Sequence, residues 1–212
     1  MSNTIDGVAV VAALIQVANV IEANKDYLCE LDSEVGDGDH GVSMTIGWRT
    51  ARKALTALRA PTPESALRAV SDAYADEVGA ASGVLYETAF DAAAKAAAGK
   101  YALNSAADWA TIYEAIGAEM QKVGKGQEGD KTLLDAWIPA ALAARGVATS
   151  GGTLGEALNG ATTAALAGVE STKNLIPKLG RAARLGERAR GYQDAGATSA
   201  YLIIRALSDA LA

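Results

Sequence analysis

Residues 4–41 read TIDGVAVVAALIQVANVIEANKDYLCELDSEVGDGDHG, an apolar run followed by an acidic, glycine-rich stretch. The apolar residues of the run recur at helical spacing and form one wide stripe, made up of Val8, Val11, Leu14, Ile15, Val20 and Leu28. This pattern predicts a helix from about Thr4 to Leu31, which ends in a loop over residues 32–41.

The rest of the chain also favours helices. Alanine dominates many segments, alternating β-branched runs are scarce, and the whole chain has only four prolines. Since there is no repeat of solenoid length and no interdomain linker, residues 1–212 are expected to form a single all-α domain, a bundle of about eight helices. After the first helix, we expect the others at about 40–59, 65–78, 83–98, 105–123, 133–149, 154–171 and 197–211.

Composition excludes several classes of function. A net charge of −6 argues against nucleic acid as a partner, because a phosphate backbone is bound by an excess of Lys and Arg. With one cysteine, Cys29, and one histidine, His40, the chain has no intrachain disulfide and no Cys/His cluster for zinc. No stretch reaches membrane-spanning length, and the N-terminal apolar run lacks the basic start of a signal peptide. We therefore expect a cytoplasmic protein with no membrane partner.

The loop after the first predicted helix is dense in carboxylates. Asp37 and Asp39 are flanked by glycines, which let the backbone bend sharply, and Asp32 lies just before them. Carboxylates so close together need a counter-charge, and oxygen ligands without Cys or His favour Mg²⁺ or Ca²⁺. A solvated Asp-Gly turn is the alternative. An EF-hand is excluded, because neither register places glycine at loop position six and glutamate at position twelve.

Three further glycine-rich segments lie between predicted helices. Residues 79–83 read GAASG and precede a helix, so their N–H groups and the Ser82 hydroxyl can receive phosphate, although Ser82 can equally be a helix cap. Residues 124–132 read GKGQEGDKT but lack the Walker spacing, and a flexible loop is the alternative. Residues 173–190 carry six Lys or Arg in an acidic chain, and Arg181 is the candidate anion ligand among them.

Taken together, these segments resemble the nucleotide-binding L subunit of dihydroxyacetone kinase. The matching motifs occur in order over nearly the whole chain: residues 31–44, 79–83, 129–132 with Asp135, and 180–199. The resemblance implies an antiparallel eight-helix barrel with Mg-ADP or Mg-ATP in the loops at one end. It also implies a phosphotransferase subunit that is active only with a separate ketose-binding K subunit.

The resemblance assigns roles residue by residue. Asp32, Asp37 and Asp39 match the ligands of two Mg²⁺ ions that bridge the nucleotide phosphates. Leu133 would pack against the adenine, where a core leucine is the alternative. The nucleotide-binding residues that the resemblance implies are His40, Gly41, Val42, Ser43, Ala81, Ser82, Gly124, Leu133, Arg181, Asp194, Ala195 and Gly196.

The chain also departs from the family pattern. The family usually has proline where Ala195 stands, histidine where Tyr192 stands, and a Ser-Tyr pair where Ala183 and Arg184 stand. These positions lie in the segment that closes over the nucleotide, so they bear on how firmly nucleotide is retained and on which ketose kinase this is.

Phosphoryl transfer needs in-line positioning and charge cancellation, and no residue here is a convincing base for a substrate hydroxyl. That base is expected on the K subunit. The phosphoryl donor is either exchanging ATP, or a phosphohistidine phosphotransferase subunit that rephosphorylates a bound ADP. A Mg-ADP-binding regulatory module, the L subunit of a tetrulose (erythrulose-type) kinase and a non-catalytic bundle are the alternatives.

Overall fold

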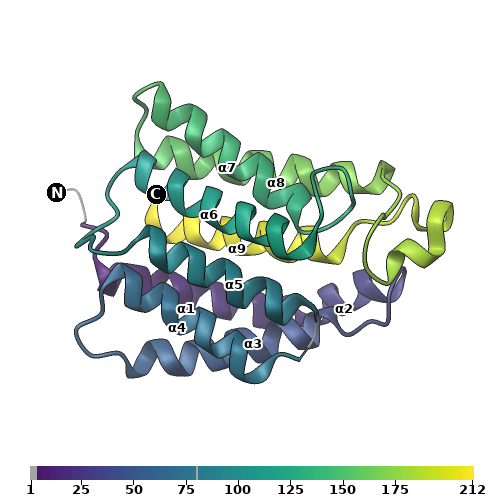
Figure 1. The fold of residues 1–212 in the computed structure, drawn as a ribbon, viewed down its shortest axis with the longest axis horizontal. Helices are drawn as coiled ribbons and strands as arrows, with labels where there is room; N and C mark the ends of the chain where they lie inside the picture. Colours follow the sequence, from purple (N-terminus) through teal and green to yellow (C-terminus); the bar gives the residue numbers. More distant parts are fainter. Residues whose placement is uncertain (1–3, 80) are drawn as a thin grey trace.

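The computed structural model describes residues 4–79 and 81–212 and is built from helices (Figure 1). In that part of the chain no strand occurs, and an isolated bridge pairs Asp6 with Ala102. The all-α prediction is confirmed. The α-helices are α1 (Gly7–Ala23), α2 (Lys25–Ser33), α3 (His40–Ala57), α4 (Pro63–Glu77), α5 (Ala81–Ala96), α6 (Ala106–Gly124), α7 (Leu134–Thr149), α8 (Leu154–Ser171) and α9 (Ala195–Leu211), with 3₁₀ turns η1 (Thr172–Asn174) and η2 (Ala182–Ala189).

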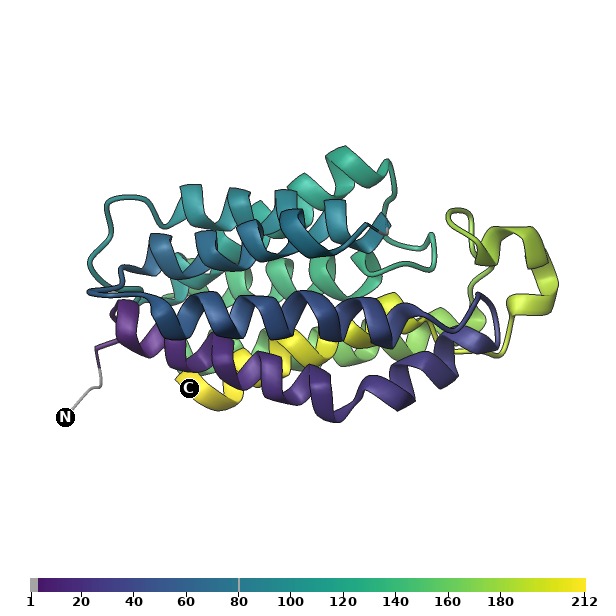
Figure 2. The same cartoon turned by 90° about the horizontal axis from the view of Figure 1, so that it is seen from below.

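The first predicted helix is in fact two helices. The chain breaks at Asn24, which has φ −103° and ψ 11°, and α1 and α2 are bent by 54° at this break. The Asn24 side chain donates to the Val20 carbonyl at 2.7 Å, so it competes with the backbone for the last turn of α1. The bend directs α2 beyond the end of the bundle, and α2 carries Asp32 on its last turn (Figure 2).

Eight of the helices form a closed ring. From α3 to α9 each helix packs against the next one in the chain, and α1 closes the ring by packing against both α3 and α9. Neighbouring helices of the ring run antiparallel (Figures 1 and 2). The interior holds two groups of fully buried aromatic rings, with neighbouring centroids in each group 5.3–6.3 Å apart: Trp48, Tyr74, Tyr86 and Phe90, and Trp109, Tyr113 and Trp137.

Antiparallel order brings alternate loops to the same end of the ring. The loop after α2, the start of α5, the α6–α7 loop and residues 172–194 all lie at the end where α2 projects (Figure 1). We call residues 172–194 the capping segment; it extends beyond the helix ends and returns to start α9 (Figure 2). The four segments singled out in the sequence therefore meet at one place.

The described part of the chain contains no single helix with the length and apolar character needed to cross a membrane. The α1–α2 pair passes that test only when its bent halves are taken together. One face of α1 is core, because Val10, Leu14 and Val17 are fully buried.

Gly168 sets how closely α8 approaches α7. A Cβ atom at this position would overlap the backbone carbonyl oxygen of Asp135. We expect Gly168→Ala to lower the free energy of unfolding by about 1–3 kcal/mol, because the helices must separate to relieve the overlap. Urea titration measures this as a lower midpoint with an unchanged slope.

Gly160→Ala is the matched control on the same helix. Its Cβ would meet Val147 Cγ2 at 3.8 Å, an ordinary contact, so the substitution should be neutral or stabilise the helix by up to about 1 kcal/mol. If both substitutions changed the free energy of unfolding equally, the close contact between α7 and α8 at Gly168 would not contribute to stability.

Candidate functional site

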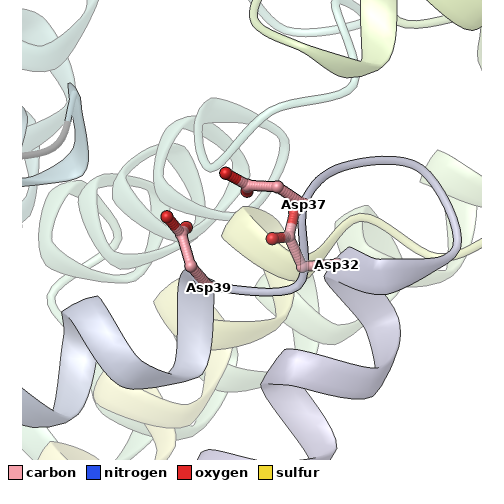
Figure 3. Close-up of side chains that lie close together, drawn as sticks. All are labelled: Asp32, Asp37 and Asp39. Atoms are coloured by element: carbon pink, nitrogen blue, oxygen red, sulfur yellow. The ribbon is translucent and has the colours of Figure 1, made fainter.

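Three aspartates converge at the loop end of the ring (Figure 3). Asp32 lies on the last turn of α2, Asp37 in the loop, and Asp39 directly before α3. One carboxylate oxygen of each lies within 4.8 Å of the other two. Asp32 is half-buried, whereas Asp37 and Asp39 are exposed. The cluster predicted from the sequence is therefore assembled in three dimensions.

Backbone hydrogen bonds fix the shape of the acidic loop. The N–H groups of Val35 and Gly36 donate to the Asp32 carbonyl at 3.1 and 2.6 Å, and the buried Val35 side chain anchors the turn. The His40 N–H donates to Asp32 Oδ2 at 3.3 Å, which orients that carboxylate toward the start of α3. Gly38 has φ +77°, a left-handed conformation that favours glycine.

Gly41 brings the two helices of the site together. A Cβ atom there would overlap the Lys25 carbonyl oxygen and lie 2.8 Å from Cys29 Sγ. Because Gly41 has no side chain, the first turn of α3 can lie directly against α2. This packing sets the separation between Asp32 on α2 and Asp39 at the head of α3.

Arg181 of the capping segment reaches across to the acidic loop. Its guanidinium forms ion pairs with Asp37 and, at 3.7 Å, with Asp39. All three side chains are about half-exposed, so the pairs contribute little to stability. One arginine leaves the three carboxylates with excess negative charge, which favours a divalent cation between them.

The donor set fits Mg²⁺. All three donors are carboxylate oxygens, the ligand type that Mg²⁺ prefers. Mg²⁺ binds oxygen at about 2.0–2.1 Å, so opposite ligands of one ion lie about 4 Å apart. The 4.8 Å spread of the cluster therefore needs only small side-chain movements to hold an ion. Asp32, Asp37 and Asp39 are the residues that would hold it.

A cavity of about 590 Å³ adjoins the cluster, a volume typical of small-molecule sites. Its acidic side is formed by the three aspartates, with Arg181 facing them. Its other side is an apolar slot formed by α5, α6 and the start of α7, whose residues include Val84, Leu85, Met120, Val123, Leu133 and Leu134. The site thus combines a flat apolar slot with a charged mouth, as a nucleotide requires.

Comparison with known proteins places the chain in a family. The model of the DAK2 domain matches residues 34–209, which include Asp37, Asp39 and the other loops of this site but begin just after Asp32. The chain belongs to the DAK2 domain family. The resemblance stated from the motifs is confirmed.

Several relatives of this DAK2 domain have known roles. It is 36% identical to the ADP-binding subunit DhaL of PEP-dependent dihydroxyacetone kinase 2 from Listeria innocua, covering 91% of this chain and 89% of the relative. It is 30% identical to the corresponding subunit from Escherichia coli, covering 92% of each. It is 33% identical to the L-erythrulose kinase of Pectobacterium atrosepticum, but there it spans 95% of this chain and only 34% of the relative.

The fold of this DAK2 domain is that of a part of dihydroxyacetone kinase from C. freundii. The crystal structure of that enzyme superposes with a TM-score of 0.75 at 23% identity, over 99% of this chain and 36% of the other. A second structure of the C. freundii enzyme, in complex with AMP-PNP and Mg²⁺, gives a TM-score of 0.72.

Most residues named from the sequence come together in the DAK2 site. Gly41, Val42 and Ser43 instead form the first turn of α3 beside the cavity, with Gly41 buried against α2. Ala81 begins α5, and its side chain lies outside the described part of the chain. The named residues that line the cavity are Asp32, Asp37, Asp39, His40, Ser82, Gly124, Leu133, Arg181, Asp194, Ala195 and Gly196.

His40 is held by a hydroxyl from α9. Its Nε2 lies 2.9 Å from Ser199 Oγ, and that hydroxyl donates to the Gly196 carbonyl at 2.9 Å. Since the hydroxyl hydrogen is already used, His40 Nε2 is the donor of the pair. Burial lowers the His40 pKa, and the charge of Asp32 opposes this only in part. His40 is therefore a neutral residue that joins the acidic loop to α9.

Asp194 caps α9 at the back of the DAK2 cavity. Its carboxylate accepts from the Ala197 N–H at 2.7 Å. Burial raises the pKa of Asp194 to about 7, and the charges of Asp135 and Asp32 act in the same direction, while the Ala197 N–H and Lys131 oppose it. Its first role is to fix the helix start that supplies Ala195 and Gly196.

Lys131 of the α6–α7 loop and Asp135 in the first turn of α7 belong to the family motif, but neither has an individual role in the sequence analysis. Asp135 accepts from the N–H groups of Gly129 and Thr132 at 2.6 and 2.7 Å, and so closes the loop on itself. Lys131 is 2% exposed, and its ammonium binds carbonyl oxygens of the capping segment. The second half of the loop is thus buried against the capping segment, whereas Lys125, Gln127 and Glu128 are exposed. The only sign of these roles in the sequence is that Lys131 and Asp135 belong to a motif that the chain shares with the family.

Proposed function

We propose that this chain is the nucleotide-binding subunit of a two-component dihydroxyacetone-type kinase. It holds Mg-ADP or Mg-ATP and transfers a phosphoryl group to a small ketose held on a separate K subunit. The observation that carries the proposal is the convergence of three carboxylates at the mouth of an apolar slot of nucleotide size. The relatives named as ADP-binding subunits of dihydroxyacetone kinases support it.

Each part of the site has a role in this proposal. The adenine packs in the apolar slot beside Leu133, and the phosphates extend toward the acidic loop. The His40 N–H is taken by Asp32, but Asp39 makes no side-chain cap, so the next N–H groups at the start of α3 can receive phosphate oxygens. Arg181 is close enough to the carboxylates to meet the same phosphates. Bound Mg²⁺, in our proposal two ions, neutralises charge on the transferred group and orients it.

The acceptor and its base belong to the partner. His40 Nε2 is engaged by Ser199, and the Asp194 carboxylate caps α9, so the titratable groups at the back of the cavity already have structural partners. The erythrulose kinases, of which this chain spans about a third, support a division in which the ketose is chosen elsewhere. An erythrulose-type L subunit is therefore the second candidate.

Calorimetric titration tests the proposal. The purified chain should bind ADP and the ATP analogue AMP-PNP when Mg²⁺ is present, and much more weakly in EDTA. Binding that is equally strong in EDTA, or no binding in either buffer, would contradict it. A phosphohistidine phosphotransferase subunit is the alternative donor, supported by relatives named as PEP-dependent and PTS-dependent.

Ala195→Pro should slow nucleotide release. Ala195 is the first residue of α9, where proline is well tolerated, and Asp194 before it has φ −76° and ψ 126°, which proline also accepts. Proline reduces the freedom that the loop loses on closing, by about 0.4–1 kcal/mol, so release should slow a few-fold. Chase of a fluorescent ADP analogue from the native chain and the variant measures this. If the native chain retains ADP through gel filtration and proline changes nothing, ADP is permanently bound and ATP is not the exchanging donor.

A further inference from the structure

Lys131 is an unusual residue in the α6–α7 loop. Its side chain is almost completely buried, and its backbone has φ +60°, a left-handed conformation that non-glycine residues rarely adopt. Gly129, two residues earlier, has φ +88°. Such strain persists only where the surrounding structure imposes it, and it is commonest at functional sites.

The ammonium of Lys131 is used entirely by the capping segment. It donates to the carbonyl oxygens of Ala189 at 2.6 Å, Tyr192 at 2.7 Å and Leu175 at 3.3 Å. An ammonium has three donors, so these bonds account for all of them. Burial lowers the Lys131 pKa, while the charge of Asp194 raises it. The three acceptors lie near the two ends of the capping segment, on either side of Arg181.

The other contacts of the capping segment with the loop are more exposed. Lys178 pairs with Asp130 at 2.7 Å; its side chain is 59% exposed, although Asp130 is buried, so water reaches the pair from the lysine side and weakens it. The Lys178 N–H also donates to the Asp130 carbonyl at 3.1 Å. Lys131 is therefore the buried connection between the floor of the cavity and the segment above it.

Stability alone does not explain a charge in this place. Removing an ammonium from water costs free energy. An apolar side chain of similar length avoids that cost but leaves three carbonyl oxygens without their donor. A buried charge that satisfies three carbonyls instead selects one arrangement of the backbone.

We propose that Lys131 is a positioning residue that sets the closed position of the capping segment and thereby places Arg181 over the nucleotide phosphates. Arg181 lies in the capping segment between the residues that Lys131 binds, and its guanidinium pairs with Asp37 and Asp39. The role in nucleotide retention rests on the proposed function, whereas the tether itself does not.

Limited trypsin digestion of the nucleotide-free chain tests the tether. Arg184 and Arg188 are exposed on the capping segment and form no ion pair in the described structure, so they report its opening. Lys131→Met should speed cleavage after these arginines by about tenfold or more, since three bonds to a charged donor are lost. Lys178→Met removes the Lys178–Asp130 ion pair and should change the rate of cleavage by less than about twofold. Unchanged cleavage in Lys131→Met would overturn the proposal.

Release of a fluorescent ADP analogue with Mg²⁺ tests the link to Arg181. Lys131→Met should speed release by about tenfold, yet add less than about twofold in an Arg181→Ala background, because both substitutions remove the same contact. Full additivity would show that Lys131 does not act through Arg181. If the Met variant does not fold, both tests are made with Lys131→Gln, which is one atom shorter than lysine but keeps an uncharged N–H donor. If the native chain binds no nucleotide, the proposed function fails and the digestion alone decides on the tether.

Discussion

Asp37→Asn is expected to reduce Mg²⁺-dependent ADP binding by about two orders of magnitude or more, equivalent to about 2.7 kcal/mol. Asp37 supplies one of three convergent carboxylates and is exposed, so the substitution removes a metal ligand and leaves the core intact. It also removes the ion pair with Arg181, which costs little because that pair is half-exposed. Calorimetric titration with Mg-ADP gives the affinity, and circular dichroism checks the helices.

Asp26→Asn is the matched control. Asp26 lies on α2, the helix that also carries Asp32. Its side chain is 98% exposed and is not part of the carboxylate cluster. It loses the same charge, so any general electrostatic effect on ADP binding should appear in both variants. Loss of affinity in Asp37→Asn alone supports the metal assignment, whereas equal or no loss in both variants would refute it.

The second large effect concerns activity. The purified chain alone should phosphorylate no dihydroxyacetone, and turnover should appear only when a ketose-binding K subunit is added. The site supplies nucleotide and metal ligands, but His40, the only histidine, is committed to Ser199, and the amine of Lys131 in the cavity lining is held by three backbone carbonyls. A coupled assay for dihydroxyacetone phosphate measures both conditions.

The control for this assay is the Asp37→Asn variant with the same K subunit. It should remain inactive, which separates activity of the complex from a contaminating kinase. Turnover by the native chain without any partner would contradict the two-component proposal.

Much of the fold was predictable because its signals are local. Alanine-rich helices punctuated by glycine and proline gave most helix limits within a few residues. Thr62 caps α4 through reciprocal hydrogen bonds with Ser65. Pro63 begins the helix, a position that suits proline because the N–H it lacks would have no partner in the helix. Asp194 starts α9 two residues earlier than predicted, because its side chain caps the helix.

What was missed depends on contacts between distant segments. The break at Asn24 replaces one predicted helix with two, and only the packing of α2 against α3 at Gly41 explains its direction. Lys131 acquires its role from carbonyls 44 to 61 residues away, which no local pattern reveals. The cluster of Asp32, Asp37 and Asp39 was predictable because all three are close together in the sequence, around one short turn.

A crystal structure of the chain grown with ADP and Mn²⁺ in place of Mg²⁺ is the most direct test of the proposed site. Anomalous scattering locates Mn²⁺ independently of the protein density. We predict two ions, each bound by carboxylates from the set Asp32, Asp37 and Asp39 and by the ADP phosphates, with the adenine against Leu133. Ions bound elsewhere, or a nucleotide outside the slot between α5 and α6, would contradict the assignment of this site.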